Sequence, residues 1–231
     1  ANNNIIAPIT IICNNETATL NNALPSPIGG DGTYAYQWKA SIDGGIVYAD
    51  ISGATGANYT SGALTSNIGS AKEYYFLRTV TSGACSVALN SNAIKITVNP
   101  VIANNVVSYG ATTIFCKTGT PGQITGAVPT GGDGTFTYQW KLSTDGVSYN
   151  NIVGETSADF TPPVLDNTGS TILNFYYTRT VTSGGCSDNS LPVQFTVNPY
   201  PVLNSALTVN ACNNVALSYT PTSTVTGTTY A

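Results

Sequence analysis

The chain repeats its own sequence about once every hundred residues, and no other feature constrains its fold as strongly. Three segments return at nearly constant offsets of 102, 101 and 99 residues: Gly29–Lys39 as Gly131–Lys141, Arg78–Ser86 as Arg179–Ser187, and Thr97–Pro100 as Thr196–Pro199. Offsets that drift this little are expected when short insertions fall in loops between strands of constant length. Repetition at a fixed period indicates tandem copies of one folding unit.

The repeat predicts two complete domains, residues 1–99 and 100–198, and the start of a third in residues 199–231. A domain of about 100 residues is large enough to bury its own core. The third copy contains Ala211–Asn214, which is similar to Ile12–Asn15, and it stops before its tryptophan. Both boundaries fall at an Asn-Pro pair, where proline cannot continue a strand ladder and stiffens the connection. We expect a piece of a longer protein, whose third copy does not fold alone.

Within each copy, apolar residues recur at every second position, which is typical of half-buried strands. The alternation is seen at Phe136, Tyr138, Trp140 and Leu142, at Ile94, Ile96 and Val98, and at Val193, Phe195 and Val197. Turn signals separate such segments, and we find no amphipathic helical stretch. The pattern predicts an all-β fold of tandem immunoglobulin-like (Ig-like) antiparallel β-sandwich domains arranged as a rod. Trp38 and Trp140 are the expected core residues that pack between the sheets.

The weak charge of the chain excludes several classes of function. Only 8% of the residues are charged, and 7 basic against 11 acidic residues leave a net charge of −4. Such a chain has no basic surface for nucleic acid or for an anionic membrane. Because it contains no histidine, it lacks the usual general base near neutral pH and the commonest metal ligand. We therefore expect no enzymatic activity, no cofactor and no bound metal.

The sequence shows neither a targeting segment nor a membrane span. The chain begins without an initiator methionine or a basic and apolar leader, so we expect any signal peptide to have been removed. No apolar run approaches the roughly 20 residues that a spanning helix needs. We expect no membrane insertion of this segment.

The five cysteines, at positions 13, 85, 116, 186 and 212, can pair in two ways that respect the repeat. Within domains, Cys13 pairs with Cys85 and Cys116 pairs with Cys186, which leaves Cys212 for a partner further along. Between domains, Cys85 pairs with Cys116 and Cys186 pairs with Cys212, which leaves Cys13 alone. We favour the pairing within domains, because the hairpin of Cys85 should lie at the end of its domain away from the next one.

The pairing within domains has one geometric difficulty. Cys13 precedes the second expected strand and Cys85 follows the sixth, and in a regular Ig-like layout those points lie at opposite ends. A bond that closes the 72 residues between them would stabilise the fold by about 4 kcal/mol. Disulfides indicate an extracytoplasmic compartment. Buried free thiols are the alternative, and a metal site is disfavoured because no two cysteines are close in sequence.

Two pairs of acidic residues recur in turn motifs of both copies, Asp31 with Asp133 and Asp43 with Asp145. One interpretation is Ca²⁺ binding between loops, which needs about six to eight oxygen ligands. We favour the other interpretation, in which Asp-Gly pairs serve the geometry of turns.

Four basic residues recur on strands that should be neighbours in one sheet: Lys39, Arg78, Lys141 and Arg179. If the arginines point outward, the aromatic residues beside them form a shallow surface-contact platform on which sugars can stack. If they point inward, their side chains merely extend toward the end of the sheet. We favour an ordinary solvated sheet face over a binding platform.

A set of motifs shared by the two copies carries a family resemblance. The motifs are Ile12-Cys13, the segment Gly29–Lys39, Ser41–Gly44, Tyr74-Tyr75 with Arg78, Cys85-Ser86 and the closing Thr97–Pro100. Over about residues 5–199 the chain resembles the repeats of SprB-type gliding-motility adhesins, which are giant cell-surface proteins of Bacteroidota. The third copy loosely resembles related PKD-like repeats. The resemblance implies export by the type IX secretion system and display as an outer-membrane-attached filament that a motor complex moves.

We therefore predict a non-enzymatic structural segment of an extracellular adhesin filament that serves gliding motility and attachment. Its expected partners are further repeats of the same chain, the gliding and secretion machinery, and polysaccharide or a solid surface. Two alternatives stay open. One is a passive spacer in a secreted hydrolase, and the other is a glycan-binding module.

Overall fold

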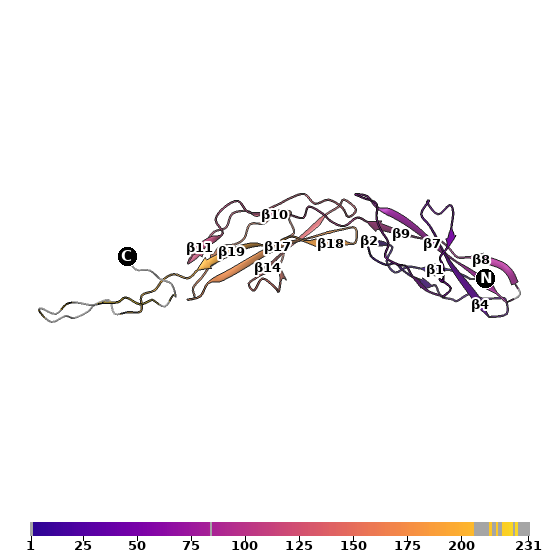
Figure 1. Ribbon diagram of the computed structural model, residues 1–231, viewed down its shortest axis with the longest axis horizontal. Helices are drawn as coiled ribbons and strands as arrows, with labels where there is room; N and C mark the ends of the chain where they lie inside the picture. The colour runs from indigo at the N-terminus through magenta and orange to yellow at the C-terminus, as the bar shows by residue number, and fades with distance from the viewer. Residues whose placement is uncertain are drawn as a thin grey trace. The chain divides into compact units, whose positions relative to one another are not determined.

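A computed structural model describes residues 2–83, 85–205, 213, 216, 219–223 and 225 of the chain. All regular elements in these residues are β-strands, which confirms the predicted all-β fold (Figure 1). The first copy of the repeat contributes β1 (Ile5–Ile6), β2 (Ile11–Cys13), β3 (Thr19–Asn22), β4 (Tyr34–Ser41), β5 (Ala49–Asp50), β6 (Tyr59–Thr60), β7 (Lys72–Ser82), β8 (Cys85–Asn90) and β9 (Ile94–Asn99). The second contributes β10 (Val107–Ser108), β11 (Ile114–Cys116), β12 (Thr118–Gly119), β13 (Thr125–Gly126), β14 (Thr137–Ser143), β15 (Asn150–Asn151), β16 (Leu165–Asp166), β17 (Leu173–Ser183), β18 (Cys186–Asn189) and β19 (Val193–Asn198). The described part of the chain holds no helix that could cross a lipid bilayer.

The chain divides into two compact units. The first is formed by Ala1–Asn105, Pro129–Thr137 and Val181–Asp188, and the second by Val106–Val128, Tyr138–Thr180 and Asn189–Ala231. The first unit thus holds the whole first copy together with one loop and one hairpin turn of the second copy. The predicted third copy, including Cys212, falls largely outside the described residues.

The first copy folds as an Ig-like sandwich of two sheets, as the sequence predicts. One sheet has the order β1-β3-β6, and the other has the order β2-β9-β7-β4-β5, with β8 also paired to β7. The long strands β4 and β7 are antiparallel, with Tyr34 opposite Ser82 and Ser41 opposite Tyr75. The short strand β2 pairs with β9 in parallel. The start and the end of the first copy therefore lie side by side at one edge of the larger sheet.

Alternating apolar residues of both sheets form the core of the first copy. Trp38 is fully buried, and it packs with Phe76, Ile96 and Val98. Its indole N–H donates to the Gly56 carbonyl at 2.8 Å. A buried tryptophan needs such an acceptor for its one polar group. Trp38 therefore lies inside the core with its polar group paired.

The second unit contains an equivalent core. Trp140 is fully buried, its ring centroid lies 5.3 Å from that of Phe160, and its indole N–H donates to the Ser157 carbonyl at 2.9 Å. The larger sheet has the order β15-β14-β17-β19-β11-β12-β16, and β10 pairs with β13 in the smaller one. Strand β11 pairs in parallel with β19, as β2 pairs with β9. The two copies therefore share the parallel strand pair as well as the tryptophan core, although β2 is an edge strand and β11 is not.

Candidate functional site at the Cys13–Cys186 disulfide

Cys13 is the last residue of strand β2 and lies beside the end of strand β9. The parallel register places Cys13 opposite Asn99. The Asn14 N–H donates to the Asn99 carbonyl at 2.8 Å, which continues the pairing past the strand end. Cys13 is therefore held next to Asn99-Pro100, where the first copy ends.

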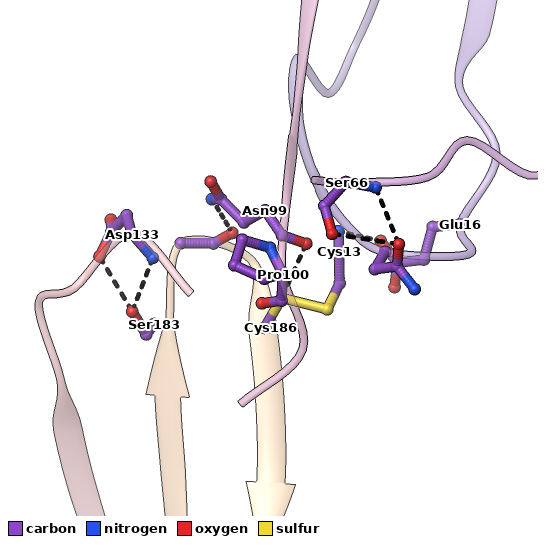
Figure 2. The surroundings of a disulfide bond; sticks show 10 residues. Cys13, Glu16, Ser66, Asn99, Pro100, Asp133, Ser183 and Cys186 are labelled. Carbon is purple, nitrogen blue, oxygen red and sulfur yellow. Dashed lines mark hydrogen bonds between the residues drawn. A yellow bond between two sulfur atoms is a disulfide. The ribbon is translucent and has the colours of Figure 1, made fainter. Parts of the chain in front are cut away.

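Cys186 begins strand β18, after a turn in which Gly184 and Gly185 both have positive φ. Its side chain is 1% exposed. Its sulfur is bonded to that of Cys13, with the two Cα atoms 5.0 Å apart and a sequence separation of 173 (Figure 2). This Cα distance is ordinary for a disulfide. The bond joins a residue of the first copy to a residue of the second.

This pairing shows that both sequence-based schemes are wrong for Cys13 and Cys186. The favoured partners Cys85 for Cys13 and Cys116 for Cys186 are not used, and Cys116 has a free, exposed thiol. The alternative scheme, which left Cys13 alone, is wrong as well. Closing 173 residues rather than 72 raises the chain-entropy stabilisation only from about 4 to about 5 kcal/mol.

The register of strand β7 explains why Cys13 cannot reach Cys85. One end of β7 is paired with Val98, close to Cys13, and its other end, Ser82, is opposite Cys85. The strand between these ends is about 30 Å long at roughly 3.3 Å per residue. A disulfide needs Cα atoms within about 7 Å. The difficulty noted in the sequence therefore excludes the bond between Cys13 and Cys85.

Polar contacts of Asn99 and Pro100, at the boundary between the two copies, surround the disulfide (Figure 2). The Asn99 side chain is 2% exposed, and its Nδ2 donates to the Gly184 carbonyl at 2.7 Å. The Gly132 N–H donates to the Pro100 carbonyl at 2.9 Å. The Cys186 sulfur lies 3.3 Å from the same carbonyl oxygen, in van der Waals contact, since a disulfide sulfur has no hydrogen to donate. We call these five residues and Cys13 the Cys13–Cys186 junction.

Close approach of two backbones at this junction requires glycine at position 131. Gly131 has a φ of 87°, and a Cβ added there would lie 2.0 Å from the Val101 carbonyl oxygen. The left-handed conformation and the lack of room both favour glycine. The Gly-Gly-Asp-Gly motif therefore packs against the segment that follows the boundary at Asn99-Pro100, in addition to forming its own turn.

Asp133 connects this glycine loop to the β17–β18 hairpin (Figure 2). Its carboxylate accepts hydrogen bonds from the Thr135 N–H at 2.8 Å and the Ser183 hydroxyl at 2.9 Å. These two bonds, the Thr135 bond first, lower the pKa of Asp133. Asp31 makes the equivalent bonds in the first copy, to the Thr33 N–H and the Ser82 hydroxyl, and its pKa is lowered too.

We expect the Asp133→Asn variant to lose part of the acid sensitivity of the parent. A carboxyl whose pKa is lowered in the folded state stabilises the fold above its unfolded pKa of about 4, and this contribution disappears as the pH falls through the lowered folded pKa. Urea unfolding midpoints measured from pH 7 to pH 3 test this expectation. Parallel pH dependences of parent and variant would contradict it.

Asp43 and Asp145 are held in their own turns. Asp43 accepts from the Ser41 hydroxyl and from the Ile46 N–H, and the Ser41 bond is the main reason that its pKa is lowered. Asp145 accepts from the Ser143 hydroxyl at 2.7 Å and from the Val147 N–H at 2.8 Å. These contacts agree with the interpretation that we favoured, in which both aspartates serve the geometry of their turns. Across the described residues, no three His, Cys, Asp or Glu side chains are grouped so that they could hold a metal ion.

Arg78 and Arg179 are 0% exposed, so both the solvated sheet face that we favoured and the surface-contact platform are wrong for these two residues. In the pairing of β4 with β7, Arg78 is directly opposite Trp38. Side chains of directly opposed residues lie on the same face of a sheet. Because Trp38 points into the core, Arg78 points into it as well.

The buried Arg78 guanidinium is held by neutral acceptors. Its Nε and Nη2 donate to the Asn3 Oδ1 at 3.0 and 2.7 Å, and Nη2 also donates to the Asn22 Oδ1 at 2.8 Å. Its Nη1 donates to the Ala57 carbonyl, and its central carbon lies 4.6 Å from the centroid of the Tyr36 ring. Burial lowers the pKa of Arg78, although arginine stays charged. Arg78 thus connects strands of both sheets.

Arg179 has the same role in the second unit. Its Nη1 donates to the Ala158 carbonyl at 2.8 Å, its Nη2 donates to the Ala127 carbonyl at 2.9 Å, and Tyr138 lies against it at 5.1 Å. A Cβ added at Gly126 would lie 1.8 Å from its Nη1. The repeated arginine is therefore a structural residue of the sandwich.

Lys39 and Lys141, the other two predicted surface-contact residues, are both half-buried. Lys39 forms an ion pair with Asp50 at 2.6 Å. Lys141 is opposite Asn151 in the β14–β15 pair, so the second copy has a neutral asparagine where the first copy has Asp50. The predicted surface-contact platform needed both lysines and both arginines on one exposed face. Because the arginines are buried, the lysines alone do not form it.

A sequence model of the family described as "Domain of unknown function (DUF8696)" matches the chain twice, over residues 2–100 and 105–199. The chain belongs to this family. The DUF8696 segments correspond to the two copies seen in the sequence, and the Cys13–Cys186 bond connects one segment to the other. No curated protein sequence matches the chain.

Two solved structures show distant similarity in fold. The FN1-FN3 domains of chicken CNTN1 match with a TM-score of 0.44 at 10% identity, covering 86% of this chain and 69% of that one. The C-terminal 282-residue fragment of intimin, in complex with the intimin-binding domain of the translocated intimin receptor, matches with a TM-score of 0.40 at 12% identity, covering 88% and 67%. At TM-scores this low, neither structure carries an argument about function.

Proposed function

We propose that the chain is a non-enzymatic, load-bearing segment of an adhesin filament on the cell surface. The observation that carries the proposal is the disulfide between Cys13 and Cys186, which ties one DUF8696 segment covalently to the next. A bond within each sandwich would stabilise single domains. A bond from one copy to the next also resists their separation, which is what a chain under tension requires.

The chemistry of the junction suits an extracellular setting. Disulfides persist in oxidising compartments and are rare in the cytosol. Besides the covalent bond, the contacts from Asn99 to Gly184 and from Gly132 to Pro100 are hydrogen bonds between uncharged groups. Contacts of this kind depend little on ionic strength, in contrast to exposed ion pairs. The junction should therefore hold in media of variable salt content.

The proposed origin, export route and role in gliding rest on the sequence motifs that the two copies share. Their resemblance to SprB-type repeats supports an origin in Bacteroidota, export by the type IX secretion system and a role in gliding motility. We further propose that residues 1–99 and 100–198 are the structural domains, arranged as a rod, and that further repeats of the chain are its partners. Binding of polysaccharide or a solid surface would then belong to the filament as a whole. The burial of Arg78 and Arg179 removes the support for a glycan-binding platform.

Cells that produce the full protein provide the test. We expect a membrane-impermeant amine reagent to label the protein on intact cells. We also expect cells with the double variant Cys13→Ser and Cys186→Ser to display the protein but to detach at lower shear than the parent. Cells with the variant Lys39→Ala, which leaves every cysteine in place and removes only a partly exposed ion pair, serve as the control.

The two parts of this test fail in different ways. Labelling only after lysis would overturn the surface location. Equal detachment of cells that display the parent and the double variant would overturn the load-bearing role.

A further inference from the structure

The free cysteine of the second copy occupies the same structural position as the bonded cysteine of the first. Cys116 ends strand β11 opposite Asn198 in a parallel pair, as Cys13 ends β2 opposite Asn99. The next N–H, from Lys117, donates to the Asn198 carbonyl at 2.8 Å, the same distance as in the first copy. An Asn-Pro pair follows in both copies. A Cys13–Cys186 junction has two halves, one with the cysteine that ends the short parallel strand and one with the hairpin cysteine. The second copy therefore carries the first of these halves.

The first copy carries the residues of the other half, which contains the hairpin cysteine. In the second copy this half consists of the Gly131–Gly134 loop and the hairpin that ends at Cys186. The first copy has the corresponding segments Gly29–Gly32 and Ser82–Cys85. The link from Asp31 to Ser82, at 3.0 Å, matches the link from Asp133 to Ser183. The side chain of Cys85 lies outside the described residues, so its assignment rests on its place in the motif.

We propose that Cys116 forms the same disulfide with the hairpin cysteine of a further copy of this unit, at the position that Cys186 holds in the second copy. A chain of such copies then has one disulfide at each junction, always from the β2-type cysteine of one copy to the hairpin cysteine of the next. By the same rule, Cys85 is the hairpin cysteine that receives the β2-type cysteine of another copy. Because the two halves differ, the contact is head-to-tail and does not close into a dimer.

The bond forms by thiol–disulfide exchange. The Cys116 thiol and the hairpin thiol each lose one proton and one electron, and a new S–S bond joins the two sulfurs. A small-molecule disulfide such as oxidised glutathione takes up both electrons and both protons and leaves as two thiols. An exposed thiol like that of Cys116 can attack such a disulfide as its thiolate without prior unfolding.

The decisive experiment extends the chain. Residues 200–231 are replaced with a second copy of residues 101–199, and the protein is refolded in a glutathione redox buffer. The digest is then mapped without reduction. We expect Cys116 to be linked to the added counterpart of Cys186 in roughly tenfold or greater excess over its other linkages, because tethering keeps the correct partner at millimolar effective concentration. The Cys13–Cys186 peptide in the same digest reports correct folding.

Other linkages in the extended chain would overturn the proposal. These are Cys116 found reduced beside an intact Cys13–Cys186 bond, Cys116 joined to Cys85 of the same molecule, or Cys116 joined to its counterpart in a second molecule. An added variant Asn198→Ala should lower the yield of the new bond, as Asn99→Ala should lower that of Cys13–Cys186, because Asn99 donates to the hairpin carbonyl of Gly184.

The chain of 231 residues gives a second measurement that does not depend on the folding of an added domain. In a Cys212→Ser background, oxidation at high protein concentration should give a ladder of oligomers that contain Cys116–Cys85 bonds between molecules. The variant Cys116→Ser should remain monomeric. A dimer linked by two Cys116 residues, or a chain that stays monomeric with Cys116 reduced, would overturn the proposal.

Discussion

Pulled from its two ends, the chain with its disulfide intact is expected to gain no length from residues 14–185. The two Cα atoms of Cys13 and Cys186 are 5.0 Å apart although their sequence separation is 173. Force therefore passes from one sulfur to the other and bypasses the residues between. After reduction these residues can extend, and at about 3.5 Å per residue they add about 600 Å of contour length.

Single-molecule stretching with and without a reductant measures this difference. The double variant Cys13→Ser and Cys186→Ser should behave like the reduced parent. The variant Cys116→Ser removes only a free and exposed thiol, so it should behave like the oxidised parent. A gain of about 600 Å in the oxidised parent would show that the two cysteines are not bonded.

The variant Arg78→Ala is expected to lower the free energy of unfolding of the first copy by about 3–5 kcal/mol. The change removes a large buried side chain and leaves a cavity. It also leaves the side-chain oxygens of Asn3 and Asn22 and the Ala57 carbonyl without their charged donor. A platform residue on the surface would have almost no such effect.

Urea unfolding followed by tryptophan fluorescence and near-ultraviolet circular dichroism measures this loss. The matched control is Lys39→Ala on the neighbouring strand, whose partly exposed ion pair with Asp50 should contribute less than about 1 kcal/mol. If Arg78→Ala lowers the stability no more than Lys39→Ala does, then the buried hydrogen bonds of Arg78 do not stabilise the fold.

The strands and cores could be predicted because their signal is local. The alternation at Tyr138 and Trp140, or at Ile96 and Val98, places one set of side chains on one face of a strand, whatever that strand pairs with. The repetition of the whole pattern then indicates two equal sandwiches. Turn residues such as Asp43 could be interpreted for the same reason, because their partners lie within a few positions in the chain.

The direction of Arg78 required a step that local patterns do not provide. Its strand is covered on both faces, with Leu77, Arg78 and Thr79 all buried in succession, so alternation alone does not separate inside from outside. The register that places Arg78 opposite Trp38 decides the matter. The signal in the sequence was present, since an inward tryptophan on one strand requires an inward partner on the next, but it can be used only when the register is known.

The order of residues is sufficient to specify repeated β units with buried tryptophans, because alternation and repetition are properties of short segments. The disulfide partner of Cys13, in contrast, is not determined by any short segment. It depends on the parallel pairing of β2 with β9, which places Cys13 at one end of its own sandwich and about 30 Å from Cys85 at the other. Which ends of the strands meet is a matter of folding in three dimensions, and that is why the disulfide links two copies and not two strands of one.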